Sequence, residues 1–121
     1  MAKVLIIEDD KFLSKIYATK LKKEGVDAEF ANDGVEGLEM MRANKPKLIL
    51  LDLIMPRKDG FGVLEEMHGD AALKKIPVLV LSNLGQESDV VKAKKLGAKD
   101  FIVKSDTSIH DVVAKIRTFI D

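Results

Sequence analysis

The chain has 121 residues, with 20 basic and 20 acidic side chains, so its formal net charge is zero. Hydrophobic residues make up 46% and charged residues 33%, the balance of one folded globular domain, which excludes a disordered segment. Zero net charge gives no global attraction to nucleic acid or an anionic membrane, and the absence of cysteine excludes disulfides, thiolate metal sites and cysteine nucleophiles.

The first ten residues lack the pattern of a secretion signal. The apolar run Val4–Ile7 is followed at once by Glu8-Asp9-Asp10, and this run is much shorter than a signal-peptide core. No apolar run later in the sequence approaches the roughly 18 residues of a membrane span. We therefore expect a soluble cytoplasmic protein with neither a membrane nor a direct nucleic-acid partner.

Five short runs along the chain predict β-strands, of which three are apolar at every position. Continuous apolar character is typical of parallel strands covered by helices on both faces of a sheet. The three continuous runs are Val4–Ile7, Leu48–Leu51 and Val78–Leu81, and the two weaker runs are Val26–Phe30 and Phe101–Val103.

Between these runs, apolar residues recur at helical spacing, as in Leu13, Ile16, Tyr17 and Leu21. Gly25 and Gly97 follow lysine-rich segments and predict helix ends. Asn32-Asp33-Gly34 predicts a turn into the second helix, and Ser108 with Asp111 has capping-box spacing ahead of the last helix.

Five alternations of strand and helix predict a single α/β domain over residues 1–121, with a doubly wound, five-stranded parallel sheet. Ligands of such sheets bind beyond the carboxyl ends of the strands. At that edge the sequence places Glu8-Asp9-Asp10, Asp52, Ser82 and Lys104.

Each of these residues also has a purely structural explanation. Glu8, Asp9 and Asp10 suit a helix N-terminus, Asp52 suits a turn ahead of Pro56, Ser82 can cap a helix, and Lys104 can be a solvated strand end. Taken together, the residues favour a site. Carboxylates that face one another repel, which raises their pKa values unless a cation lies between them.

A hard divalent cation such as Mg²⁺ or Mn²⁺ satisfies this requirement, because it prefers oxygen ligands from carboxylates, water and phosphate. A carboxylate beside such an ion can attack a phosphoryl group, while the ion and a lysine neutralise the transferring charge. This pattern indicates phosphoryl transfer to an aspartate, with Ser82 donating a hydrogen bond to the phosphate.

The sequence resembles the receiver domain of two-component response regulators over its whole length, and most closely the stand-alone chemotaxis type. The resemblance is carried by Glu8-Asp9, by Asp52 in Asp52-Leu53-Ile54-Met55-Pro56 followed by Asp59-Gly60, and by Ser82 and Lys104. It implies a flavodoxin-like fold, with βα repeated five times.

The resemblance implies that Asp52 is the phospho-acceptor, Asp9 a metal ligand, Glu8 a metal-site acid acting largely through water, and Ile54 a ligand through its backbone carbonyl. Lys104 would pair with the phosphoryl oxygens. Ser82 would close on the phosphate while Phe101, otherwise a plain core residue, turns inward as the switch aromatic.

The implied phosphodonor is a sensor histidine kinase or a phosphotransfer protein. The implied output is a downstream protein bound at the fourth helix, fifth strand and fifth helix. The domain would then catalyse only the phosphorylation and dephosphorylation of its own aspartate and would not be an enzyme in the usual sense. A domain excised from a longer regulator would have the same sequence features.

The sequence departs from the family pattern at three places. Ser105 follows Lys104 where the family usually has proline, often after a cis bond, and a cis bond to a non-proline residue costs roughly 2.5–4 kcal/mol. Asn83 replaces a small residue and would crowd the phosphate entry. Ile54 and Leu84 replace side chains that are often polar near the attacking water.

The residues after the first strand argue against two other functions. A haloacid-dehalogenase-type phosphatase would need Asp-x-Asp after the first strand, and a dinucleotide-binding module would need a glycine-rich turn there, but the chain has Glu8-Asp9-Asp10-Lys11. The remaining alternative is a receiver-like interaction domain that works without phosphorylation.

Overall fold

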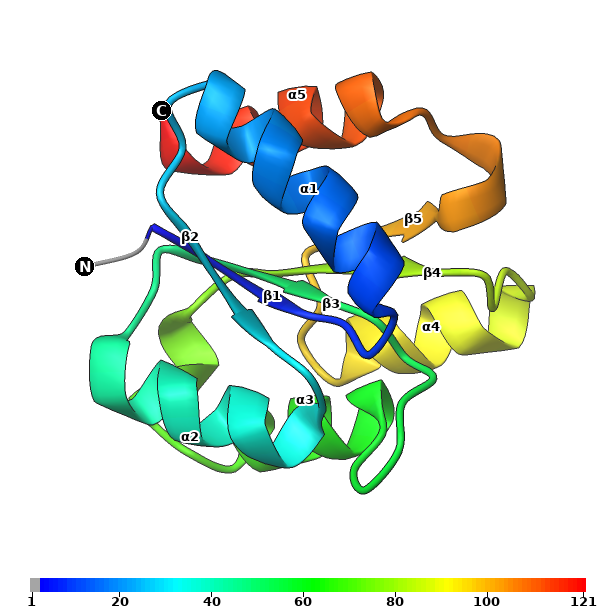
Figure 1. The fold of residues 1–121 in the computed structure, drawn as a ribbon. Coiled ribbons are helices and arrows are strands. Elements are labelled where there is room, and N and C mark those ends of the chain that lie inside the picture. The colour runs from blue at the N-terminus through cyan, green and yellow to red at the C-terminus, as the bar shows by residue number, and fades with distance from the viewer. Residues whose placement is uncertain (1–2) are drawn as a thin grey trace.

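The computed structural model describes residues 3–121 as a five-stranded sheet between two layers of helices (Figure 1). The strands are β1 (Val4–Ile7), β2 (Ala28–Ala31), β3 (Leu48–Leu51), β4 (Val78–Ser82) and β5 (Asp100–Val103). The helices are α1 (Lys11–Lys23), α2 (Gly34–Asn44), α3 (Gly60–His68), α4 (Glu87–Lys95) and α5 (Ile109–Ile120), with short 3-10 turns at Leu73–Lys75 and Lys104–Asp106.

All strand pairs are parallel, and the strand order is β2-β1-β3-β4-β5. In Figure 1, α1 and α5 cover one face of the sheet, while α2, α3 and α4 cover the other. The predicted doubly wound, flavodoxin-like α/β fold is therefore confirmed.

Alternate residues of each central strand enter two different apolar cores. Leu48 and Leu50 pack in the core beneath α1 and α5, whereas Ile49 and Leu51 pack in the core beneath α2 and α3. Since successive strand side chains point to opposite faces, a strand covered on both sides must be apolar at every position. This explains the continuous apolar runs in the sequence.

The second strand lies two residues later at its start than the predicted Val26–Phe30. Gly25 has φ +73, in the left-handed region that favours glycine, and the N–H of Val26 then donates to the carbonyl of Leu21. Val26 thus closes the end of α1 with its side chain buried, and strand pairing begins at Ala28.

The other predicted helix boundaries agree with the structure. Gly97 also has positive φ, Asp33 accepts from the N–H of Glu36 at the start of α2, and Ser108 accepts from the N–H of Asp111 at the start of α5. None of the helices in the described part of the chain has the length and apolar character that a membrane crossing requires.

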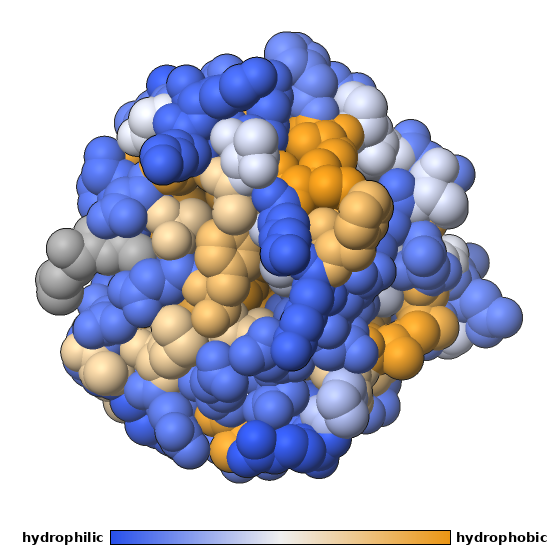
Figure 2. All heavy atoms as spheres, in the orientation of Figure 1, coloured by the Kyte–Doolittle hydropathy of each residue, from blue (hydrophilic) through white to orange (hydrophobic). Residues whose placement is uncertain are grey.

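The visible face of the molecule is largely hydrophilic, with several separate apolar areas, one of which lies over α1 and the start of α5 (Figure 2). A groove there is lined by Phe12, Ile16 and Ile109 and rimmed by lysines. Phe12 is 75% exposed and lies in the first turn of α1, close in sequence to the acidic residues after β1. Apolar surface therefore extends up to the carboxyl edge of the sheet.

Candidate functional site

The register of β1 and β3 brings Glu8 and Asp52 together. Ile7 pairs with Leu51, so the residues that follow them are neighbours at the carboxyl edge of the sheet. The N–H of Asp52 donates to the carbonyl of Ile7 at 3.1 Å, which fixes the start of the β3–α3 connection against the end of β1. Asp52 is only 7% exposed and Glu8 only 3%.

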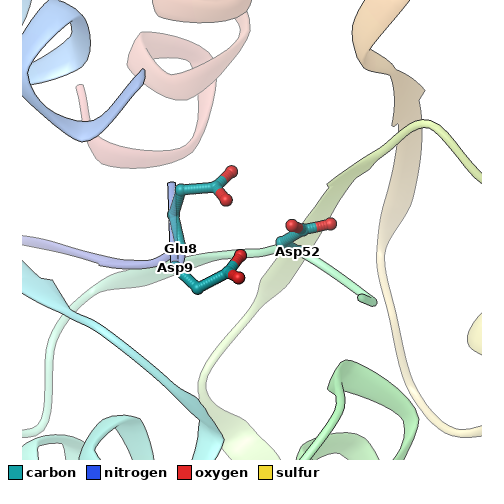
Figure 3. Close-up of side chains that lie close together, drawn as sticks. All are labelled: Glu8, Asp9 and Asp52. Carbon is teal, nitrogen blue, oxygen red and sulfur yellow. The ribbon is translucent and has the colours of Figure 1, made fainter. Parts of the chain in front are cut away.

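Glu8, Asp9 and Asp52 form a cluster of carboxylates. Each offers one oxygen, and these oxygens lie within 4.8 Å of one another. Figure 3 shows the three side chains directed into the space between the end of β1 and the end of β3. Asp9 is exposed, so the cluster opens to solvent on one side. This set of hard oxygen donors fits Mg²⁺ or Mn²⁺, which combine one or two carboxylates with water.

The acids after β1 divide between two roles. Asp10 caps α1, because its Oδ1 accepts from the N–H groups of Phe12 at 3.0 Å and Leu13 at 3.1 Å. Glu8 and Asp9 instead contribute to the carboxylate cluster. Of the three acids, Asp10 is the one that caps the helix, and its own N–H donates to Glu8 Oε2 at 3.1 Å.

Lys104 connects the cluster to the end of β5. Its Nζ donates to Glu8 Oε1 at 2.5 Å and to Asp52 Oδ2 at 3.2 Å. Sequence reasoning placed Lys104 beside Asp52 but missed its bond to Glu8, which joins residues 96 positions apart. The only available signal was the opposite charge of two side chains at the same sheet edge.

The ionisation of the site reflects the burial of its charged groups together with their hydrogen bonds and mutual charge interactions. Burial raises the pKa of Glu8 to about 7, even though the hydrogen bond from Lys104 opposes this. Burial lowers the pKa of Lys104, but its hydrogen bond with Glu8 and the charge of Asp52 outweigh burial and raise that pKa overall. Both net shifts favour the more positive form, which is the electrostatic condition that a bound cation relieves.

Unfolding at different pH values tests the raised pKa of Glu8. Because the pKa of Glu8 is about 7 in the folded protein and 4.5 ordinarily, its protonation stabilises the fold fully below pH 4.5. We expect that stabilisation, up to about 3 kcal/mol, to be lost as the pH rises through 7. Urea unfolding in EDTA should show this loss in the natural protein, and Glu8→Gln should lack it. Parallel pH profiles for the two proteins would contradict the expectation.

Ser82 ends β4 and is completely buried, with its hydroxyl accepting from the N–H of Leu84 at 3.3 Å. It pairs with Val103, the last residue of β5, so Lys104 follows directly after the residue that lies beside Ser82. Phe101 lies on the edge strand β5 and is half-buried, packed against the core beneath α2 and α3. A role for these two residues in switching stays a prediction.

The β3–α3 connection is shaped by the residues that follow Asp52. The N–H of Ile54 donates to Asp52 Oδ1 at 3.4 Å, while the Ile54 side chain is 56% exposed. A Cβ on Gly60 would lie 2.4 Å from the Asp52 carbonyl oxygen, so only glycine lets α3 start so close to Asp52. The role of the Ile54 carbonyl in metal binding stays a prediction.

The structure also answers the question about the Lys104–Ser105 peptide bond. No cis peptide bond occurs among residues 3–121, so this bond is trans. The N–H of Ser105, which a proline would lack, donates to Asn83 Oδ1 at 3.1 Å. The sequence marked Asn83 and Ser105 as separate departures from the family pattern but did not predict this contact.

Known proteins resemble this chain in sequence and in fold. The chain matches the family described as "Response regulator receiver domain" over residues 4–117. It is 33% identical over 104 residues to Protein PilH of Pseudomonas aeruginosa, covering 86% of both chains. It is 34% identical over 120 residues to the DNA-binding dual master transcriptional regulator RpaA of Synechocystis, covering 99% of this chain and 49% of RpaA.

The chain therefore spans about half the length of several of the curated relatives that it matches, RpaA among them. Among solved structures, the receiver domain of the Francisella response regulator 1452 superposes with a TM-score of 0.90 at 28% identity, covering 99% of this chain and 97% of that chain.

Proposed function

The chain belongs to the family of response regulator receiver domains, and we propose that its Asp52 accepts a phosphoryl group from the phosphohistidine of a histidine kinase or phosphotransfer protein. The reaction would depend on Mg²⁺ or Mn²⁺, and its product would alter a protein-binding surface. In this proposal residues 1–121 act as one receiver domain in the cytoplasm.

The observation that carries the proposal is the surroundings of the Asp52 carboxylate. It lies at the end of a buried strand, accepts from Lys104 Nζ at 3.2 Å and shares an oxygen cluster with Glu8 and Asp9. A carboxylate serving only as a turn former has no need of a partly buried lysine or of two further acids beside it. The arrangement suits a nucleophile beside a cation site.

In the transfer, an oxygen of Asp52 forms a new bond to phosphorus while the bond between phosphorus and the donor's imidazole nitrogen breaks. The electron pair of that broken bond stays on the imidazole. Lys104 Nζ, which donates to Asp52 Oδ2 before the reaction, is placed to neutralise the charge on the phosphoryl oxygens during transfer. Glu8, Asp9 and Asp52 would hold the metal ion, which supplies charge neutralisation and orientation when bound.

The partner that supplies the phosphoryl group must contact the surface around Asp52. Two exposed apolar side chains, Phe12 at 75% and Ile54 at 56%, belong to the segments that flank the carboxylate cluster. They provide apolar contact area for a protein donor. The downstream partner would bind the face formed by α4, β5 and α5, where half-buried Phe101 lies on the edge strand.

Phosphorylation by a small phosphodonor tests the proposed function. The natural protein treated with acetyl phosphate and Mg²⁺ should gain one phosphoryl group by intact-protein mass spectrometry, and EDTA should prevent the gain. A protein that gains none, and that also fails to receive phosphate from a phosphorylated histidine kinase domain, would act instead as a phosphorylation-independent interaction domain.

The exposed Ile54 side chain leads to an expectation about the lifetime of the phosphorylated state. Hydrolysis needs a water positioned in line with the phosphorus–oxygen bond, and an aliphatic side chain cannot orient it. Ile54 lies outside the core, whereas Leu84 packs against it. A polar residue at position 54 should therefore reduce the stability of the fold less than one at position 84.

We expect Ile54→Asn to speed loss of phosphate on the order of tenfold, and Ile54→Asn with Leu84→Glu to speed it further. Loss of the phosphoryl mass over time, with Mg²⁺ present and the donor removed, measures the rate. Ile54→Val is the matched control and should keep the natural rate. A double variant with the natural rate would show that these positions do not govern the water.

A further inference from the structure

The β4–α4 connection, residues 83–86, is held against the end of β5 at two points. Asn83 Oδ1 accepts from the N–H of Ser105 at 3.1 Å. Two residues later, a Cβ on Gly85 would lie 3.2 Å from Cγ2 of Val103, so the backbone of the connection rests directly on the Val103 side chain. This loop is therefore attached to the neighbouring strand and not only to its own helix.

The attachment lies immediately beyond the phosphorylation site. Asn83 directly follows Ser82, and Ser105 directly follows Lys104, whose side chain is bonded to Glu8 and Asp52. Since Ser82 pairs with Val103 in the sheet, the Asn83–Ser105 bond continues that pairing past the end of the strands. One side of the bond is thus anchored to the site through Lys104.

The position of Ser82 gives this bond a consequence. Its fully buried hydroxyl accepts from the N–H of Leu84, so a hydrogen bond joins Ser82 to the connection, and the two would move together if Ser82 closes on a phosphoryl group at Asp52. Such a shift would stretch the contact between Asn83 and Ser105. A contact that is stretched in this way would favour the unphosphorylated arrangement over the closed one.

We propose that the hydrogen bond between Asn83 and the backbone of Ser105 is a latch that restrains the β4–α4 connection before phosphorylation. Asn83 is then a positioning residue that acts through Ser82, and the proposal rests on the proposed function of Asp52. A single hydrogen bond of this kind changes a two-state equilibrium by about two- to tenfold, which is the expected size of the effect. A proline at position 105 lacks the N–H and could not form the latch.

The test compares affinities for beryllofluoride, which stands in for a phosphoryl group on the Asp52 carboxylate, with Mg²⁺ present. Asn83→Ala removes the acceptor, and Ser105→Pro removes the donor. Each should bind beryllofluoride about two- to tenfold more tightly than the natural protein. Ser105→Ala keeps the backbone N–H and is the matched control, so its affinity should be unchanged.

The double variant Asn83→Ala with Ser105→Pro separates a latch from simple crowding of the phosphate entry by Asn83. A latch is fully broken by either change, so the second should add nothing, whereas relief of crowding would leave the Ser105→Pro affinity at the natural value. Loss of stability in Asn83→Ala with unchanged beryllofluoride affinity would reduce the bond to a structural contact and overturn the proposal.

Hydrogen exchange at the Ser105 amide tests whether the latch forms, independently of whether Asp52 accepts a phosphoryl group. In the protein without beryllofluoride, the amide of Ser105 should exchange severalfold faster in Asn83→Ala than in the natural protein or in Asn83→Asp. Equal exchange rates would show that the bond does not form in solution and would overturn the latch alone. Failure of the natural protein to bind beryllofluoride, with the latch present, would overturn the role of Asp52 and the switching role of the latch with it.

Discussion

Asp52→Asn should receive no phosphoryl group from acetyl phosphate or from a phosphorylated histidine kinase domain. The amide that replaces the carboxylate is uncharged, and its single oxygen is too weak a nucleophile for the reaction. The substitution also leaves Lys104 with one charged partner, Glu8, instead of two. The expected change is therefore complete loss of labelling, measured by intact mass with Mg²⁺ present.

The matched control for this experiment is Asp10→Asn. Asp10 is also an acid beside the site, but it caps α1, and asparagine is an equally good N-cap residue. Asp10→Asn should therefore be labelled like the natural protein. Labelling of Asp52→Asn to the natural extent would place the acceptor at another residue and refute the proposed function in its present form.

Asp9→Ala should bind Mg²⁺ at least roughly tenfold more weakly than the natural protein, since loss of even an outer-shell partner of a metal costs 10–100-fold in affinity. Three carboxylate oxygens within 4.8 Å make the site, and removing one leaves too few hard ligands for a strongly hydrated ion. Asp9 is exposed, so its removal should leave the fold intact. Glu8 is buried and bonded to Lys104, so its removal would change the stability of the fold as well as the metal site.

Calorimetric titration with Mg²⁺ measures this affinity directly and suits a chain that contains no tryptophan to report binding by fluorescence. Asp10→Asn again serves as the control and should retain the natural affinity. An unchanged affinity in Asp9→Ala, with the thermal unfolding temperature also unchanged, would show that the ion binds away from the end of β1.

Much of this protein was determined by local features of its sequence. The runs Val4–Ile7, Leu48–Leu51 and Val78–Leu81 are apolar at every position because helices cover both faces of the sheet, and the structure confirms them as β1, β3 and most of β4. A parallel sheet directs the ends of its strands to one edge. The meeting of Glu8, Asp9, Asp52 and Lys104 could therefore be predicted from their positions after the strands.

Only the tertiary structure decided which partner each of these side chains takes. Three features depend on strand register and on loop paths: the bond of Lys104 to Glu8, the helix-capping position of Asp10 next to Asp9 in the carboxylate cluster, and the contact of Asn83 with Ser105. Each links atoms to within about 3 Å, whereas a strand end located from sequence is uncertain by one or more residues of about 3.3 Å each.

The start of the second strand shows the same limit. The β-type residues from Val26 predicted a strand, but the left-handed turn at Gly25 and the bond from Val26 to Leu21 assign Val26 to the end of α1. Local propensity does not include that hydrogen bond, which forms only where the chain turns back onto the end of α1. The outcome was decided by how the end of α1 packs, which is a property of the whole fold.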